Sequence, residues 1–312
     1  MINQLKIGRN CLDMLNEIAI VPSYNVDSEK WNRCINESGN GLIYATTSWL
    51  DHLADHWTGI VFNDYEMVMP VPWRRKLGIR YCYHVPFIQQ LGIFCGKKIP
   101  DVKLFKQALF SICRYGDYPF NFSNSIGETE DFVNFILPLD VKFEDLAKLF
   151  SNDAVQNIRR SEGQALNYEN GEIDEAFHYY QKLYGALSGV TDEQFDKFRK
   201  LCVFIGKTDE ILVRKVTGSN GILLAVALLP RDKKRMYNLM NSTLPEGKTR
   251  EANYFLLSRL WMEFEESGMI FDFEGSDIPG VRDFYRKFGA INQPYHKLHF
   301  NHLPWPMKFL KK

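Results

Sequence analysis

The sequence predicts an α/β (α+β) protein of two tandem lobes, each a mixed, twisted sheet flanked by helices. Three observations support this class. The 312 residues exceed what one ordinary core needs and suit two lobes of roughly 150 residues. One order of elements occurs twice: helices, three extended segments, a long helix and a strand. Core-forming side chains are abundant, with 45% hydrophobic and 14% aromatic residues. We therefore expect lobes at residues 1–150 and 151–312, joined by a crossover helix at about 141–163.

Charge and cysteine usage narrow the functional class. The 38 basic residues balance the 38 acidic ones, so net charge gives no general reason to expect binding to nucleic acid or to a membrane surface. The six cysteines form no CxxC motif, which indicates reduced thiols in a cytoplasmic protein. No secretory signal is apparent, and the most apolar run, residues 221–230, has about half the length of a membrane span. We expect a cytoplasmic protein without membrane insertion.

The first lobe begins with short elements and continues as a meander. A helix at residues 46–57 places Trp49, Leu50 and Leu53 on one face. Alternating and β-branched residues predict the strands that follow, and a second amphipathic helix and two more strands complete the lobe. The expected elements are a strand at 2–7, helices at 27–36, 46–57 and 101–115, and strands at 59–63, 66–73, 79–86, 118–123 and 132–139.

The second lobe repeats this order. Its expected elements are helices at 174–187, 192–206 and 251–267 and strands at 210–217, 222–230 and 235–242. A strand, a charged turn and an amphipathic helix then occupy residues 271–290. Phe271 and Phe273 alternate with Asp272 and Glu274, as in a strand, and the helix that Pro279 opens is followed by a glycine at the usual left-handed C-cap position.

Three segments carry a resemblance to a known family. FYRKFGA at residues 284–290 resembles the ending of the last helix in GNAT acyltransferases. NIRRSEG at 157–163 and DFEGSDIPGVRDFYRKFG at 272–289 resemble elements of the FemAB and FemX-like branch, in which two GNAT lobes are fused. The resemblance spans residues 44–302. It implies transfer of an acyl or aminoacyl group from acyl-CoA or aminoacyl-tRNA to an amine, with a peptide or sugar-peptide precursor of the cell wall as acceptor.

The sequence departs from that family in two places. We find no Arg/Gln-x-x-Gly-x-Gly/Ala loop, whose backbone N–H groups would bind the coenzyme A pyrophosphate, and residues 245–250 read PEGKTR instead. The long helical arm that the family links to tRNA is also missing. These departures leave the donor open. They motivate an alternative function, a non-catalytic module that keeps the fold and binds a ligand or peptide.

Two residues are the catalytic candidates. The resemblance assigns Tyr285 as the acid that protonates the leaving group, although its place on the apolar stripe of its helix suits a core residue equally well. Glu274 stands at a strand end, where a carboxylate can accept the proton of the amine. Ser276 and Asp277 are candidate substrate-binding residues in the same turn, and Asp277 suits a helix N-cap as well.

Further substrate-binding candidates lie in three segments. The strand at 235–242 carries Tyr237, Asn238 and Asn241, and the two asparagines can face one groove only if a bulge interrupts the strand. In the first lobe, basic and aromatic residues suit a phosphate or carboxylate, and adjacent glutamines in an apolar segment need polar partners if buried. The alternative for the basic segment that includes Arg75 is a solvated hairpin turn, and the alternative for Arg159 is ordinary surface charge. These candidates are Trp73, Arg75, Gln89, Gln90 and, in the crossover helix, Arg159.

A metal site is not expected. His52 and His56 are four residues apart on a helix, but no third ligand has a suitable spacing. Acyl transfer to an amine needs neither a metal nor a covalent intermediate. The apolar residues at 303–310 suggest a homodimer as one further possibility.

Overall fold

The computed structural model describes residues 18–96, 102–124, 126–127, 129–208, 210–275 and 279–310. The chain divides into two compact units. Unit 1 comprises Met1–Phe132 and Tyr295–Lys312, and unit 2 comprises Val133–Pro294. The division differs from the predicted lobes at 1–150 and 151–312, because a strand near the end of the chain pairs within the unit 1 sheet. The strand predicted at 2–7 lies outside the described residues.

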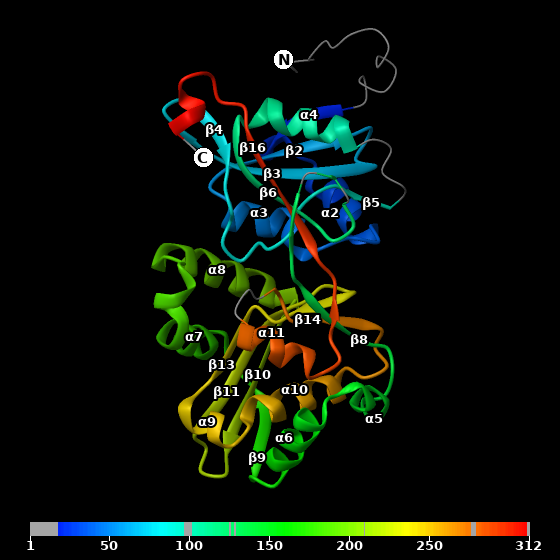
Figure 1. Ribbon diagram of the computed structural model, residues 1–312, viewed down its shortest axis with the longest axis vertical. Coiled ribbons are helices and arrows are strands. Elements are labelled where there is room, and N and C mark those ends of the chain that lie inside the picture. Colours follow the sequence, from blue (N-terminus) through cyan, green and yellow to red (C-terminus); the bar gives the residue numbers. More distant parts are fainter. Residues whose placement is uncertain are drawn as a thin grey trace. The chain divides into compact units, whose positions relative to one another are not determined.

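Unit 1 is built around one eight-stranded sheet with helices packed on it (Figure 1). The strand order is β1-β2-β3-β4-β6-β16-β7, and β5 pairs with β3. The strands are β1 (Ile18–Pro22), β2 (Trp57–Phe62), β3 (Met67–Lys76), β4 (Ile79–Cys82), β5 (Phe94–Cys95), β6 (Tyr115–Phe120), β7 (Glu130–Phe132) and β16 (Tyr295–Asn301). The helices are η1 (Ser23–Asn25), α2 (Ser28–Glu37), η2 (Ile43–Ala45), α3 (Thr47–Leu53), α4 (Val102–Ile112) and η5 (Met307–Leu310).

Unit 2 contains two four-stranded sheets, ordered β13-β11-β10-β9 and β12-β14-β8-β15. The strands are β8 (Phe135–Leu139), β9 (Leu166–Asn170), β10 (Ile211–Gly218), β11 (Leu223–Pro230), β12 (Arg235–Tyr237), β13 (Met240–Thr243), β14 (Met269–Asp272) and β15 (Ile291–Asn292). The helices are α5 (Phe143–Leu146), η3 (Ala147–Leu149), α6 (Asn152–Glu162), α7 (Ile173–Ser188), α8 (Asp192–Ile205), η4 (Gly206–Thr208), α9 (Pro245–Thr249), α10 (Ala252–Glu263) and α11 (Pro279–Arg286).

The two units share one layout, which confirms the predicted mixed α/β fold with a repeated order of elements. In unit 1, β4 pairs in parallel with β6, and α4 lies between them in the sequence. In unit 2, β12 pairs in parallel with β14, and α10 lies between them. The other pairs between the named strands are antiparallel, so each unit combines parallel and antiparallel pairing.

The predicted crossover helix at 141–163 is not one helix. The segment folds as α5, η3 and α6, with an extended break at Phe150 and Ser151. Ser151 caps the new helix, because its hydroxyl accepts the Ala154 N–H at 3.2 Å. Phe150 is buried against Trp261 and Phe288. The gain from burying this ring and capping α6 explains why the helix is interrupted here.

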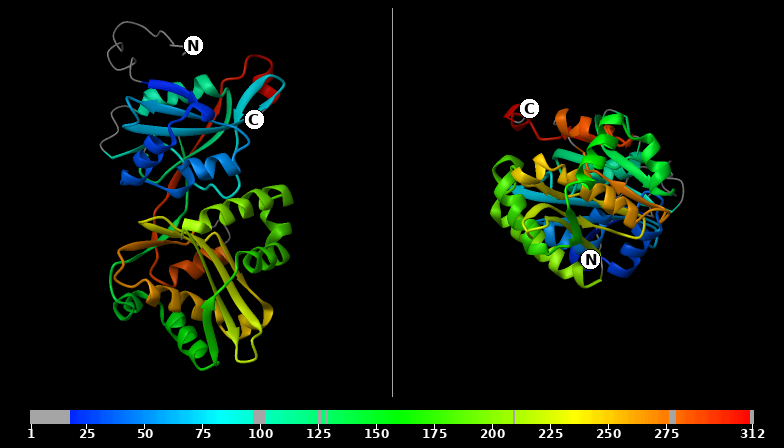
Figure 2. Two further views of the ribbon diagram at one scale, coloured as in Figure 1. Left: turned by 180° about the vertical axis from the view of Figure 1, so that it is seen from behind. Right: turned by 90° about the horizontal axis from the view of Figure 1, so that it is seen from below.

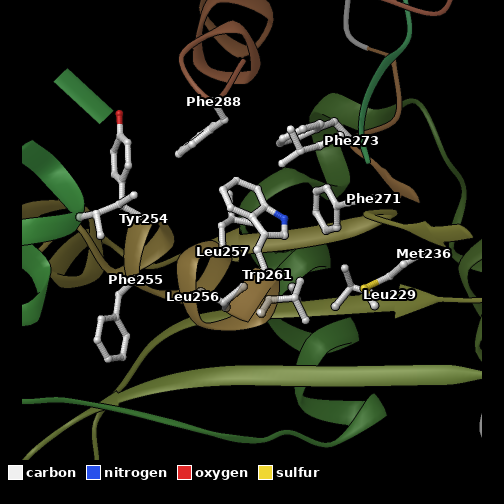
Figure 3. Packing of buried hydrophobic residues seen from close by; sticks show 14 of the residues in the cluster. Leu229, Met236, Tyr254, Phe255, Leu256, Leu257, Trp261, Phe271, Phe273 and Phe288 are labelled. Carbon is white, nitrogen blue, oxygen red and sulfur yellow. The ribbon is translucent and has the colours of Figure 1, made fainter. Parts of the chain in front are cut away.

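The core of unit 2 is centred on Trp261 of α10 (Figure 3). Its fully buried indole contacts Phe271, Phe273 and Phe288, with ring centroids 5.6, 6.0 and 4.9 Å away. Edge-to-face packing of this kind adds to the free energy gained by burying apolar area. Because Phe271 and Phe273 bracket Asp272, the aromatic core fixes the strand end at which the candidate site begins.

The described cysteines are all buried free thiols: Cys34, Cys82, Cys95, Cys113 and Cys202. Cys11 lies outside the described residues. None of the helices that the structure describes combines the length and the apolar character that crossing a bilayer requires.

Candidate functional site

The strand predicted at 235–242 leaves one sheet of unit 2 and enters the other. β12 pairs with β14 up to the Tyr237–Asp272 pair, whereas β13 pairs with β11. At the break, the Asn238 N–H donates to the Asp272 carbonyl at 2.8 Å and the Leu239 N–H donates to the Tyr237 carbonyl at 2.9 Å. The sheets therefore separate at residues 238–239.

The break brings the two predicted asparagines together. The Asn241 side-chain amide lies 3.4 Å from the Asn238 side-chain oxygen, to which it donates. Residues three apart in an unbroken strand face opposite sides of the sheet. The strand is thus interrupted between Asn238 and Asn241, as it must be for both side chains to face the same side, and the two amides lie where β12 and β13 separate.

Asp272 ties both sides of this break together. Its carboxylate accepts from the Arg235 guanidinium, from the Asn134 amide at 3.3 Å and from the Glu274 N–H at 2.9 Å. Asp272 and Arg235 are only 1% and 4% exposed. A buried charge pair of this kind is tolerated when further hydrogen bonds satisfy its polar atoms. Gln293 supplies one of them, since its side-chain oxygen accepts from Arg235 at 3.0 Å.

Glu274 follows this strand end in a left-handed backbone conformation, with φ of 63°. Such a φ is uncommon outside glycine, asparagine and aspartate, so the local contacts must enforce it. The hydrogen bond from its N–H to the Asp272 carboxylate is one such contact. Glu274 is half-buried, and its carboxylate is close enough to affect the ionisation of Tyr285.

Tyr285 projects from α11 toward the same strand end. Its ring lies 4.5 Å from that of Phe273 and 6.2 Å from that of Phe135. Burial raises the pKa of the Tyr285 hydroxyl, and the nearby Glu274, Tyr180 and Asp272 raise it further. Among the described residues the hydroxyl has no hydrogen-bond partner in the protein. Tyr285 is therefore a neutral phenol with a proton to donate.

The other predicted residues of unit 2 lie in varied surroundings. Tyr237 is fully buried, and its hydroxyl donates to the Asp232 carboxylate at 2.8 Å in the turn before β12. Arg159 is exposed in the last turn of α6. Ser276 and Asp277 lie outside the described residues. Their roles in substrate binding stay predictions.

The predicted residues of unit 1 form two separate groups. Trp73 stacks on His56 at 4.5 Å and donates its indole N–H to the Thr58 hydroxyl at 3.0 Å. Arg75 is exposed near the tip of the β3–β4 hairpin. The adjacent glutamines do have polar partners. The buried Gln90 donates to the Gln89 side-chain oxygen at 2.7 Å, and its own oxygen accepts the Phe122 N–H at 3.1 Å.

Sequence reasoning missed Arg235, Asp272 and Tyr180. In the sequence, Asp272 is only the polar residue between Phe271 and Phe273 in an alternating strand. A usable signal was present, because Arg235 and Asp272 are opposite charges within two apolar strands that the predicted fold places side by side. Tyr180 gave no such signal, since its position on α7 relative to α11 depends on the tertiary fold.

A short helix replaces the glycine-rich loop between β13 and α10. Gly247 of α9 packs directly on β11, where an added Cβ would lie 2.1 Å from the Leu224 carbonyl oxygen. Glu251, at the N-cap of α10, has a φ of 54° and makes no capping bond with its side chain. The segment is thus an ordered turn of helix.

In the described part of the chain, no group of three or more His, Cys, Asp or Glu side chains is arranged to hold a metal ion. No family model matches the sequence, and no curated protein matches it.

Solved structures resemble the fold over nearly the whole chain. The crystal structure of FemX superposes with a TM-score of 0.67 at 13% identity, covering 91% of this chain and 98% of FemX. L-PGS from Bacillus licheniformis gives a TM-score of 0.54 at 13% identity, covering 91% and 95%. A tandem GNAT protein from the clavulanic acid biosynthesis pathway gives 0.51 at 8% identity, covering 92% and 99%. The chain therefore has a FemX-type fold of two tandem GNAT-like lobes.

Proposed function

We propose that the protein is an acyltransferase, which moves an acyl or aminoacyl group from an activated donor to an amine. One observation carries the proposal: Glu274, Tyr285, Asn238 and Asn241 gather where the two sheets of unit 2 separate. The group supplies a proton acceptor, a proton donor and amide N–H groups. The fold shared with FemX and a tandem GNAT protein supports the same reaction class.

The proposed reaction is a direct displacement. The amine nitrogen attacks the acyl carbonyl carbon, and a carbon–nitrogen bond forms as the donor's carbon–sulfur or carbon–oxygen bond breaks. The Glu274 carboxylate accepts the proton that the amine loses, and the Tyr285 hydroxyl protonates the departing sulfur or oxygen. Between turnovers, Glu274 releases the proton that it accepted and Tyr285 regains the proton that it donated, each by exchange with the solvent.

We assign polarisation of the carbonyl to side-chain amides. The backbone N–H groups of Asn238 and Leu239 already donate within the protein. The amide group of Asn241 donates one hydrogen to Asn238 and has a second N–H. Such a donor, positioned before reaction, stabilises the negative charge that develops on the carbonyl oxygen.

Donor and acceptor follow from the family resemblance as proposals. Acyl-CoA and aminoacyl-tRNA are the candidate donors, and a peptide or sugar-peptide precursor of the cell envelope is the candidate acceptor. Purified protein should be assayed with both donors against a panel of primary amines. Glu274→Gln and Tyr285→Phe should each lower the rate about 10²-fold or more, the usual range for general acid–base groups.

Matched controls separate chemistry from folding. Glu246→Gln and Tyr179→Phe make the same chemical changes elsewhere in unit 2 and should leave the rate unchanged. Wild-type rates in a Glu274→Gln, Tyr285→Phe double variant would refute the assigned roles, and absence of transfer with either donor would refute the function.

A non-catalytic binding module is the second candidate. The short helix α9, which occupies the place of a pyrophosphate-binding loop, favours it. Calorimetry with coenzyme A and with tRNA tests this reading. Tight binding of either molecule favours the transferase, whereas binding of a peptide alone, without turnover, favours the module.

A further inference from the structure

A line of basic residues crosses one end of the sheet in unit 1. Arg75 of β3 stands directly opposite Arg80 of β4. The Arg114 N–H donates to the Arg80 carbonyl at 3.1 Å, and the His302 N–H donates to the Arg114 carbonyl at 2.7 Å. Because β3, β4, β6 and β16 are successive neighbours, these four residues form one row across the sheet. We call it the basic row.

The basic row is not neutralised by the protein around it. Arg75, Arg80 and Arg114 are exposed, and within the described residues none of them forms an ion pair. Two acidic residues on neighbouring segments are used elsewhere, since Asp55 binds Arg74 and Asp117 binds His299. Like charges directly opposite on adjacent strands destabilise a sheet. An anionic partner would offset that cost.

Two exposed apolar side chains lie beyond the basic row. β3 and β16 both run toward this end of the sheet, as the pairing directions from β3 through β4 and β6 to β16 require. Leu77 follows β3 and is 86% exposed, and Trp305 follows β16 and is 81% exposed. Figure 1 and the left view of Figure 2 show the β3–β4 hairpin, in cyan, beside the C-terminal turn, in red.

We propose that this end of unit 1 docks on an anionic lipid surface. The arginines of the basic row would contact lipid phosphates, while Leu77 and Trp305 would enter the boundary between headgroups and acyl chains. Basic residues near a negatively charged leaflet attract it, and tryptophan and leucine gain free energy at that boundary. A nucleic acid would also pair with the arginines, but an exposed leucine at the hairpin tip adds nothing to phosphate or base recognition.

Vesicle sedimentation tests the proposal with the full-length protein. Wild-type protein should bind phosphatidylcholine vesicles that contain about one third phosphatidylglycerol, and this binding should weaken as the salt concentration rises. It should not bind vesicles of pure phosphatidylcholine. The triple variant Arg75→Gln, Arg80→Gln, Arg114→Gln should bind about a hundredfold more weakly. The double variant Leu77→Ser, Trp305→Ser retains the charges and should bind roughly tenfold more weakly.

A matched variant controls for net charge. Lys182→Gln, Lys200→Gln and Lys207→Gln remove three exposed charges from unit 2 and should leave vesicle binding unchanged. In the wild type, the emission of Trp305, isolated by comparison with Trp305→Phe, should shift to shorter wavelength on binding. A folded triple variant that binds like the wild type would overturn the proposal. Equal binding to neutral and anionic vesicles would also overturn it. So would a wild-type protein that binds tRNA through the basic row but does not bind vesicles.

Discussion

At the scale of single residues, the candidate site depends on how Asp272 is held. Its carboxylate and carbonyl bind Arg235, Glu274 and Asn238. Glu274 has a left-handed backbone conformation, and its N–H donates to this carboxylate. The negative charges of Glu274 and Asp272 both raise the pKa of Tyr285. Asp272 therefore positions the proposed base, Glu274, through a hydrogen bond from the Glu274 N–H.

Removing the charge of Asp272 should destabilise unit 2. Asp272→Asn leaves the Arg235 guanidinium buried without the carboxylate that it faces, and breaking such a pair costs about 3–5 kcal/mol in the free energy of unfolding. Urea denaturation measures the loss. Asp174→Asn is the control, because its pair with Arg199 is exposed and should contribute less than about 1 kcal/mol. Equal losses in the two variants would contradict the anchoring role.

The raised pKa of Tyr285 sets the direction of a pH effect. Burial and nearby negative charge penalise the phenolate, so the folded protein retains this proton above the ordinary tyrosine pKa of about 10. The active, protonated form should therefore persist to a higher pH, and transfer should fall only as pH rises through the elevated pKa. Ultraviolet difference titration of wild type against Tyr285→Phe measures this pKa. A Tyr285 that ionises at or below the ordinary value would contradict the prediction.

The sequence indicated these residues only in part. Glu274 was predicted at a strand end and Tyr285 near it on the next helix, because both relations are local in the chain. The buried Arg235–Asp272 pair spans 37 positions, and Tyr180 reaches Tyr285 from α7. Contacts of that kind depend on tertiary packing, which local periodicity does not encode.

At the scale of elements, the breaks in regular structure position the site. The strand predicted at 235–242 becomes β12 and β13, and the helix predicted at 141–163 becomes α5, η3 and α6. Periodicity located both segments but not their interruptions. Each interruption is stabilised by distant partners, namely Asp272 at the first and Trp261 at the second.

The contact of α9 with β11 offers a test of element packing. Gly247→Ala would place a Cβ 2.1 Å from a backbone oxygen of Leu224, so the short helix must move. We expect a loss of about 1–3 kcal/mol in the free energy of unfolding, as for other overpacked sites. Gly280→Ala in α11, where an added Cβ meets nothing within 4 Å, should instead gain about 0.5–1 kcal/mol. Denaturant titration of the two variants compares them, and a Gly247→Ala protein as stable as Gly280→Ala would argue against close packing.

At the scale of the whole molecule, repetition of one order of elements predicted a tandem fold, and the likeness to FemX confirms it. The observed division of the chain did not follow from the sequence, which predicted a boundary at residue 150. It depends on β8 pairing with β14 and on β16 pairing with β6, each across more than a hundred residues. Hydrophobic patterns indicate that such strands exist, but they do not determine which strands pair with one another.

The continuity of unit 2 predicts independent folding. Residues 133–294 carry two sheets and an aromatic core of their own. Expressed alone, this segment should unfold in one cooperative transition, followed by circular dichroism in urea. A segment that lacks a cooperative transition would show that unit 2 needs residues outside its own range to fold.

The pairing of β16 also has a consequence for synthesis. Its partners β6 and β7 leave the ribosome before any part of unit 2, and β16 leaves after all of it. The sheet of unit 1 thus stays incomplete, with one side of β6 open, throughout translation of the inserted unit. A unit 2 that folds independently, as predicted above, would fold while the nascent chain is still attached, whereas β16, which leads to His302 of the basic row, is synthesised after unit 2. The proposed lipid-docking face would then form only after unit 2 has been synthesised, and a chain stalled before β16 would not dock on the membrane surface.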